Sequence, residues 1–259
     1  MKLDIIYEDN NILICFKPAG IATQTSKVSE QDMVSLIKIY LAKERKEKSP
    51  YVGVIHRLDQ PVSGLLVFAK NKEAAASLSR QIQDGDANKD YMAFCTGILE
   101  EKKKTLVHYI AKDPVTKLAR VISEEEYGKR NKDFVTNING VEKNIELSDY
   151  KKAILTYEVE KEFEDASIIK VHLQTGRFHQ IRAQFSFIGH ALLGDVKYGN
   201  EDSKKIAMKH RIRMVALCAN ELDLMHPITG EKLQFILPQS KLPKEMRDKN
   251  EIEEESQKK

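Results

Sequence analysis

Short apolar segments bounded by turn-forming residues are the feature that most constrains how this chain folds. Ile12–Phe16 follows two asparagines and ends at Lys17-Pro18-Ala19-Gly20, and it has the length of a buried strand. Gly64–Ala69 has the same character. Further strand candidates are Val52–Ile55, Asp90–Cys95, Tyr157–Val159 and Ile168–Leu173. In Asp90–Cys95 the period of two places Tyr91, Ala93 and Cys95 on one face.

Helical periodicity alternates with these strand candidates. Residues 31–48 carry apolar side chains at helical spacing before a run of charged residues. Asn71 is suited to cap a second helix that ends at Asp84-Gly85-Asp86. A third helix is expected after Thr175-Gly176, with Gly189 as its stop. Residues 100–150 show no clear period, so the pattern alone establishes only interspersed strands and helices.

Composition excludes several classes of protein. Of the 259 residues, 41% are hydrophobic and 31% are charged, which is typical of a globular chain and not of a disordered one. No apolar run approaches the roughly 18 residues of a membrane span, and the first residues lack the apolar core of a signal peptide. We therefore expect a cytoplasmic protein. The net charge of +3 permits a nucleic-acid partner without arguing for one.

The positions of the three cysteines argue against a disulfide or a metal site. Cys15, Cys95 and Cys218 lie far apart, and each sits in an apolar run. Free cysteine in such surroundings behaves as a small buried hydrophobe. We expect three buried thiols and neither a disulfide framework nor a metal site.

The first cluster that could carry chemistry is His56-Arg57-Leu58-Asp59, which is followed by Pro61-Val62-Ser63-Gly64. The proline biases Gln60 toward an extended conformation, so Asp59 falls at a strand end or in a loop. A carboxylate on a loop held by rigid elements is well placed to meet a ligand. Spacing alone leaves a second interpretation open, in which Asp59 only caps a turn through its side chain.

The second cluster is Leu173–Arg182, which we expect to place Arg177 in the first turn of a helix. A cation there opposes the helix dipole unless an anion is nearby, such as an internal carboxylate or a substrate phosphate. The alternative is an exposed basic helix end. His179 suits a catalytic base, a metal ligand or a hydrogen-bonded structural histidine, and no ligand set at metal-binding spacing accompanies it.

Two further features have an ordinary and a functional interpretation. Tyr91, next but one to Lys89, is either a core tyrosine of a strand or a reactive group. A basic stretch is either a solvated face or an RNA-contacting patch. Its residues are Lys204, Lys205, Lys209, Arg211 and Arg213.

Together and in this order, the clusters resemble the RluA family of RNA pseudouridine synthases, which modify ribosomal and transfer RNA. The resemblance runs from about Tyr7 to Pro238. Beyond the clusters above, it rests on Ser63-Gly64-Leu65-Leu66, Ala69-Lys70, Gly189-His190, Gly194-Asp195, Tyr198-Gly199, Leu217-Cys218-Ala219 and His226-Pro227. Several motifs in the same order along more than 200 residues are far more specific than any one of them.

The resemblance implies roles for individual residues. Asp59 matches the catalytic aspartate, Arg177 the arginine that pairs with it, and Tyr91 the tyrosine that stacks on the target base and helps to deprotonate it. Arg57 matches a residue that enters the RNA as the uridine leaves its stack. The remaining residues that we expect to contact RNA are His56, Lys17, Lys89, His179, Gln180 and Arg182.

The chemistry of the residues agrees with these implied roles. Isomerisation breaks the N1–C1′ bond, turns the uracil and joins C5 to C1′, for which one carboxylate suffices. A glycoside hydrolase would usually need two. An aspartate in a dry pocket stays ionised more easily beside an arginine, which explains why Asp59 and Arg177 belong together.

The chain departs from the family pattern at Val62, Phe178, Gln184 and Cys218, which affects substrate detail and not the reaction. The resemblance implies one α+β catalytic domain over residues 1–240 with a mixed, mainly antiparallel sheet. Many members of the family carry an additional N-terminal RNA-binding domain of the S4 type, and we expect that domain to be absent here because the strand before Lys17 begins close to Met1. We also expect a monomer, and the resemblance implies no metal or cofactor. The charged residues 241–259 are expected to form a disordered tail.

Two other classes of protein compete with this interpretation. A catalytically idle RNA-binding module would have no need of an ionised aspartate paired with an arginine. A nucleoside hydrolase or glycosylase would release free uracil, whereas an isomerase releases none.

Overall fold

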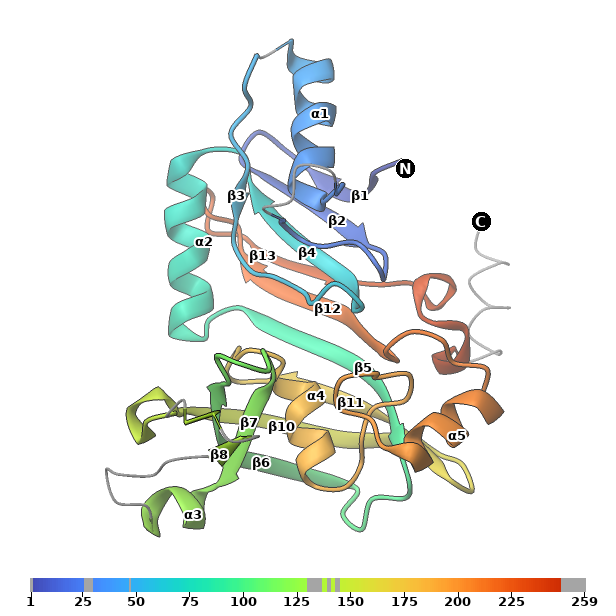
Figure 1. Ribbon diagram of the computed structural model, residues 1–259. Helices are drawn as coiled ribbons and strands as arrows, with labels where there is room; N and C mark the ends of the chain where they lie inside the picture. The colour runs from blue at the N-terminus through green and yellow to red at the C-terminus, as the bar shows by residue number, and fades with distance from the viewer. Residues whose placement is uncertain are drawn as a thin grey trace. The chain divides into compact units, whose positions relative to one another are not determined.

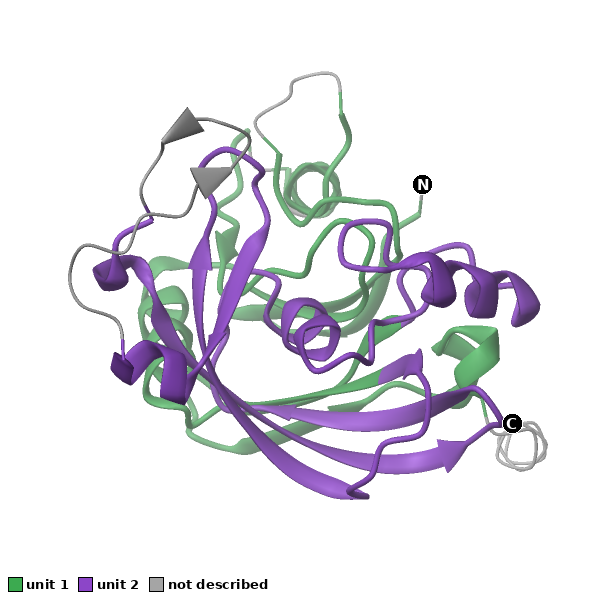
Figure 2. Cartoon of the chain, turned by 60° about the horizontal axis from the view of Figure 1, so that its bottom comes forward, with its two compact units in different colours: residues 1–92, 217–259 green, residues 93–216 purple. Residues whose placement is uncertain are grey.

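A computed structural model describes residues 2–25, 30–46, 48–129, 137–138, 141–142 and 145–247. The chain forms two compact units, which Figure 2 distinguishes by colour. Unit 1 comprises residues 1–92 and 217–259, and unit 2 comprises residues 93–216. Strand β5 (Asn88–Thr96) carries the chain from unit 1 into unit 2. The expectation of one catalytic domain over residues 1–240 stays a prediction.

Unit 1 is built on a mixed sheet in which β1-β2-β4-β12 are neighbours in that order, β3 pairs with β4, and β13 pairs with β12 (Figure 1). Its strands are β1 (Asp4–Glu8), β2 (Ile12–Lys17), β3 (Gly53–Val54), β4 (Ser63–Ala69), β12 (Leu217–Met225) and β13 (Lys232–Ile236). Strands β4 and β12 are parallel, whereas the β1–β2, β2–β4, β3–β4 and β12–β13 pairs are antiparallel. Helices α1 (Met33–Arg45) and α2 (Lys72–Asp84) complete the unit, together with two short 3₁₀ helices, Gln239–Lys241 and Lys244–Met246.

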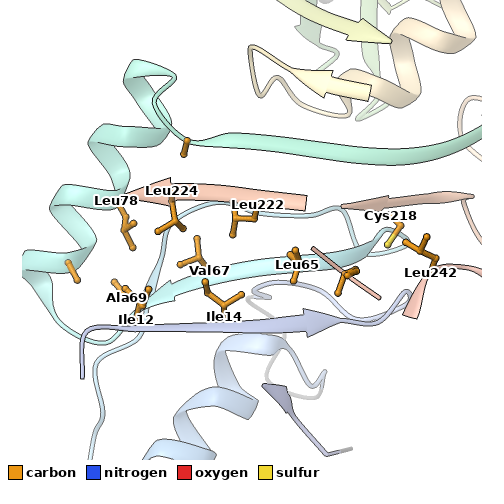
Figure 3. Close-up of a cluster of buried hydrophobic side chains, with 13 residues drawn as sticks. Ile12, Ile14, Leu65, Val67, Ala69, Leu78, Cys218, Leu222, Leu224 and Leu242 are labelled. Carbon is orange, nitrogen blue, oxygen red and sulfur yellow. The ribbon is translucent and has the colours of Figure 1, made fainter. Parts of the chain in front are cut away.

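A hydrophobic core joins the strands of unit 1 to α2. Side chains at alternate positions of β2, β4 and β12 meet Leu78 of α2 in this core (Figure 3). They include Ile12, Ile14, Leu65, Val67, Leu222 and Leu224. Asn71 caps α2 by accepting a hydrogen bond from the Ala74 N–H at 2.8 Å, and Gly85 ends the helix at φ +84°. The predicted strands, helix and cap are therefore confirmed here.

The folded chain continues past the expected boundary at residue 240. Leu242 belongs to the core of unit 1, and Met246 is also buried. Burial of these apolar side chains holds the chain to the unit as far as the described residues extend. The part of the expected tail beyond Arg247 lies outside the described residues.

Unit 2 is built on the antiparallel strands β11-β10-β6-β7. They are β6 (Lys103–Lys112), β7 (Ala119–Ser123), β10 (Lys151–Glu162) and β11 (Ala166–Leu173). The helices are α3 (Glu124–Lys129), α4 (Gln180–Phe187) and α5 (Glu201–Lys209), with a 3₁₀ turn at Leu147–Asp149 and a small hairpin of β8 (Asn137–Ile138) and β9 (Val141–Glu142). Residues 100–150, which showed no clear period, thus contribute two strands to the main sheet of this unit.

Helix α4 packs against this sheet. Ala183 of α4 lies in a cluster with Ile110, Ala119 and Ala153 from the strands. The helix begins at Gln180, which corrects the expectation that Arg177 occupies its first turn. His179 adopts a left-handed conformation (φ +53°) immediately before the helix, so the helical hydrogen-bond pattern cannot extend back to Arg177.

The expected α+β class with a mixed, mainly antiparallel sheet is confirmed. All three cysteines are free and buried, as their apolar surroundings predicted. Among the described residues, no helix is both long and apolar enough to cross a membrane.

Candidate active site

The loop that carries Asp59 connects β3 to β4 in unit 1 and is tied to the segment after β2 through Lys17. The Lys17 side chain is fully buried. Its Nζ donates hydrogen bonds to the carbonyls of Pro18 (3.1 Å), Ile21 (2.7 Å) and Gln60 (3.1 Å). The ammonium group thus uses all three protons inside the fold, which corrects the expectation that Lys17 contacts RNA.

Further hydrogen bonds fasten both sides of Asp59. The Gly20 N–H donates to the Gln60 carbonyl at 2.8 Å, and the Gln60 side chain donates back to the Gly20 carbonyl at 3.1 Å. On the other side, the Thr23 hydroxyl bonds to both backbone groups of Leu58. The Asp59 carbonyl accepts from the Val62 N–H at 3.0 Å, which closes a turn. Asp59 therefore stands on a loop held at several points.

Lys17 and Tyr91 lie within electrostatic range of the half-buried Asp59. Burial lowers the pKa of Lys17 to about 8, and the negative charge of Asp59 opposes that shift. Tyr91 is only 6% exposed, and burial raises its pKa, with a further rise from the charge of Asp59. The structure thus brings Lys17, Asp59 and Tyr91 together, as three predicted site residues of one unit.

Cys218 also borders this group of residues. Cys218 of β12 is the strand-pairing partner of Ser63 in β4. The two side chains also form a hydrogen bond with each other. Burial raises the pKa of this thiol to about 11, so it is neutral at physiological pH. Cys218 therefore contributes a small uncharged side chain next to Lys17 and Tyr91.

The other predicted residues of unit 1 differ in exposure. Arg57 is exposed, whereas His56 and Lys89 are half-buried. Burial, with the charge of Lys89, lowers the pKa of His56 to about 3, so the imidazole is neutral. Its Nε2 accepts a hydrogen bond from the Val67 N–H at 3.4 Å, which directs the ring into the fold. Arg57 is thus the cation of this loop that faces solvent.

In unit 2, Arg177 is exposed and lies in the turn before α4. Its Nε donates to the Lys152 carbonyl at 2.8 Å, and its backbone N–H donates to the Gln180 side chain at 2.9 Å. These bonds fix the guanidinium stem and the backbone of the turn. Asp59 belongs to unit 1 and Arg177 to unit 2, so their pairing stays a prediction.

Gln180 and Arg182, which we expected to contact RNA, are each 3% exposed. The Gln180 Oε1 also accepts from the Thr175 hydroxyl at 2.8 Å, and its Nε2 donates to the Ile154 carbonyl at 3.1 Å. Arg182 binds Asp195 through two parallel hydrogen bonds of 2.7 and 2.8 Å. The structure corrects both expectations, because these polar groups organise the interior of unit 2.

His179 has the surroundings of a structural histidine. Its Nδ1 lies 2.7 Å from the Tyr198 hydroxyl, which also accepts from the Ala119 N–H at 2.7 Å. The ring stacks on Phe178 with centroids 3.7 Å apart. Within the described residues, no group of three histidine, cysteine or carboxylate side chains is arranged to hold a metal ion.

Sequence reasoning missed Thr23. Its hydroxyl bonds to a residue 35 positions later, and no spacing rule connects the two. The nearby Lys17-Pro18-Ala19-Gly20 motif was the one available signal that this segment belongs to the site.

Comparison with known proteins identifies related chains. A family model described as RNA pseudouridylate synthase matches residues 11–187. A tRNA pseudouridine synthase C from Haemophilus ducreyi is 30% identical over 234 residues, covering 90% of this chain and 89% of the relative. A ribosomal large subunit pseudouridine synthase D from Neisseria meningitidis is 32% identical over 244 residues, covering 92% of this chain and 58% of the relative. Among solved structures, human RNA pseudouridylate synthase domain containing 4 matches with a TM-score of 0.72 at 19% identity, covering 94% of this chain and 90% of that one.

Proposed function

Because the chain belongs to the RNA pseudouridylate synthase family and is an RNA pseudouridine synthase, an isomerase, we propose that Asp59 is the carboxylate that acts on the target uridine. The observation that supports this assignment is the fastened loop of unit 1, which presents Asp59 beside the buried Tyr91. A group that must meet a reacting atom works best when its backbone is held in place.

The reaction needs one carboxylate and a path for one proton. The N1–C1′ bond breaks, the uracil turns, C5 bonds to C1′, C5 loses its proton and N1 gains one, so that the product is an isomer of the substrate. Asp59 either attacks C1′ or removes a proton from the sugar. Both routes leave the RNA mass unchanged, which distinguishes the isomerase from a base-releasing hydrolase.

Tyr91 is proposed to stack on the uracil and to relay the proton from C5. Its raised pKa keeps the phenol neutral. A neutral phenol accepts a proton only as it passes its own onward, which suits a relay better than a free base. A flipped uridine costs a few kcal/mol to unstack, and stacking on an aromatic ring offsets part of that cost.

Arg177 is proposed to pair with Asp59 and to keep it ionised. A guanidinium is always charged and matches the geometry of a carboxylate. Arg57, Lys89 and His56 are proposed to line the path of the RNA, with Arg57 entering the strand as the uridine leaves. His179 is proposed to support that path through the turn before α4.

The substrate is proposed to be ribosomal or transfer RNA, since the named relatives act on these two classes. We further propose that the protein works in the cytoplasm as a monomer without a cofactor. Mapping pseudouridines in total RNA from cells with and without the gene would identify the modified position.

Asp59→Asn tests the catalytic assignment. We expect turnover of uridine-containing RNA to fall by at least about a thousandfold, with RNA affinity unchanged, because the variant keeps the shape of the side chain and loses its charge. Pseudouridine formation and RNA binding are measured on the same substrate. Full residual isomerisation would remove Asp59 from the mechanism, and release of free uracil by the wild type would point to a hydrolase.

Arg177→Met tests the proposed charge partner. Pseudouridine formation should fall while the free energy of unfolding changes little, because the side chain is exposed and the substitution removes its hydrogen bond to the Lys152 carbonyl. Wild-type turnover in this variant would show that Asp59 does not depend on Arg177.

A further inference from the structure

Thr23 makes an unusual pair of hydrogen bonds with the residue that precedes Asp59. Its hydroxyl accepts from the Leu58 N–H at 3.2 Å and donates to the Leu58 carbonyl at 3.1 Å. Thr23 is 3% exposed and Leu58 is 6% exposed. One buried hydroxyl therefore satisfies both backbone polar groups of Leu58, as a paired strand would.

Thr23 is itself held by the start of α1. The Val34 N–H donates to the Thr23 carbonyl at 3.2 Å, and the Met33 N–H donates to the Ala22 carbonyl at 3.1 Å. Asp32, the N-cap of α1, accepts from the Thr25 N–H at 2.6 Å. The bonds from Met33 and Val34 use N–H groups that a helix start leaves without intrahelical partners. The hydroxyl of Thr23 is therefore fixed relative to a rigid helix.

The two bonds to Leu58 restrain the peptide groups on both sides of that residue. The peptide group formed by the Leu58 carbonyl leads directly into Asp59. On the far side of Asp59, the Gln60 carbonyl accepts from both Lys17 and Gly20. The backbone that carries the Asp59 side chain is therefore clamped before and after this residue.

We propose that Thr23 is a positioning residue for Asp59. Its hydroxyl sets the orientation of the Leu58–Asp59 peptide and, through it, the direction of the carboxylate. This inference rests on the proposed catalytic role of Asp59. The Thr23 hydroxyl is buried against Leu58, so it acts on the chemical step and not on RNA binding.

Thr23→Val and Thr23→Ser test the proposal as a pair. Valine has nearly the shape of threonine but leaves the Leu58 N–H and carbonyl without their partner, whereas serine keeps the hydroxyl. We expect the single-turnover rate at saturating RNA to fall about tenfold or more in Thr23→Val. The RNA concentration at half-saturation should stay within about twofold of the wild type, because a buried hydroxyl makes no RNA contact. Thr23→Ser should keep the single-turnover rate of the wild type, because it keeps the hydroxyl.

Asn71→Ala is the matched control for stability. It removes the cap of α2, which follows the far end of β4 from Asp59, and it weakens the same unit without touching the Asp59 loop. All variants are assayed at a temperature where circular dichroism shows them folded. If Thr23→Val does not fold, Thr23→Ala, which fits any space that threonine occupies, replaces it.

The outcomes separate this inference from the proposed function. The positioning role would be overturned by any of three results. They are an unchanged single-turnover rate in Thr23→Val, an equal loss of rate in Asn71→Ala, and a change in Thr23→Val that affects only the RNA concentration at half-saturation. Asp59→Asn is measured alongside. If Asp59→Asn keeps its activity, the catalytic assignment of Asp59 fails, regardless of the result for Thr23. If Asp59→Asn is inactive and Thr23→Val is fully active, only the positioning role of Thr23 is overturned.

Discussion

Lys17 is a buried cation, and burial makes its charged form less favourable than in water. Burial lowers its pKa to about 8, and the nearby Asp59 reduces the size of that shift. Three carbonyl oxygens replace the water that the ammonium group loses. The lysine therefore joins two loops by hydrogen bonds and also places a positive charge near the candidate catalytic aspartate.

His56 should make the protein less stable in acid. Its pKa is about 3 in the fold because of burial and the Lys89 charge, whereas an unfolded histidine titrates near 6.5. Between these values the unfolded chain binds a proton that the native chain does not, so the free energy of unfolding falls as the pH drops from 6.5 toward 3.

The variant His56→Gln removes this titration and keeps an acceptor for the Val67 N–H. Urea unfolding at pH 7, 6 and 5 should show the wild type losing about 1 kcal/mol more than the variant for each pH unit below 6. Parallel pH dependences in the two proteins would contradict a His56 side chain that stays neutral in the fold.

At the scale of elements, the parallel pairing of β4 with β12 depends on Gly64. A Cβ at this position would lie 2.4 Å from both the backbone nitrogen and the carbonyl oxygen of Ala219. The residue also has φ +133°, which side chains rarely adopt. Ser63, the first residue of β4, comes directly after the Asp59 loop and pairs with Cys218 of β12. The close approach of the two strands at Gly64 therefore also holds the end of the Asp59 loop beside Cys218.

Gly64→Ala should destabilise the protein by about 3 kcal/mol or more, through overpacking and backbone strain combined. Gly85→Ala is the matched control, since Gly85 has φ +84° and a Cβ added there would meet no atom within 4 Å. It should cost only about 1 kcal/mol. Urea unfolding of both variants measures the difference, and equal losses would show that contact with Ala219 is unimportant.

Helix α4 shows how a single residue sets the position of an element. His179 has a left-handed backbone conformation, so α4 begins only at the next residue. The hydrogen bond between the His179 ring and the Tyr198 hydroxyl holds His179 in this position. Arg177 consequently lies in a turn, where Lys152 and Gln180 hold it. The arginine is thus presented by fixed backbone and not by the first turn of a helix.

At the scale of the whole molecule, the small net charge of +3 means that RNA binding depends on where the cations lie. Buried cations such as Lys17 and Arg182 release no counterions from RNA, whereas exposed Arg57 does so when it contacts a phosphate. Counting lysines and arginines therefore overestimates the charge available to the substrate.

Arg57→Ala should weaken RNA binding and reduce the slope of log affinity against log salt by about 1. Arg57→Lys keeps the charge and should keep the slope. Filter binding or fluorescence anisotropy across a range of salt concentrations measures both variants. A slope that is identical in Arg57→Ala and the wild type would remove Arg57 from the RNA-contacting residues.

Local structure and family membership could both be predicted from the amino-acid sequence. Apolar segments of strand length, the Asn71 cap and the Gly85 stop depend on nearest neighbours, and they appear in the structure where the pattern predicts them. The apolar surroundings of the cysteines likewise predicted their burial. Ordered motifs around Asp59 and Arg177 identified an RNA pseudouridine synthase, because such motifs combine many residues into one specific signal.

Which polar residues form hydrogen bonds inside the fold depends on the tertiary structure. Lys17 bonds to Gln60 across 43 positions, and Thr23 bonds to Leu58 across 35. Gln180 and Arg182 are buried, although we expected both to contact RNA. Periodicity reports the neighbours of a residue along its own element. Pairs that join distant segments depend instead on how the strands and loops pack, which no local pattern encodes.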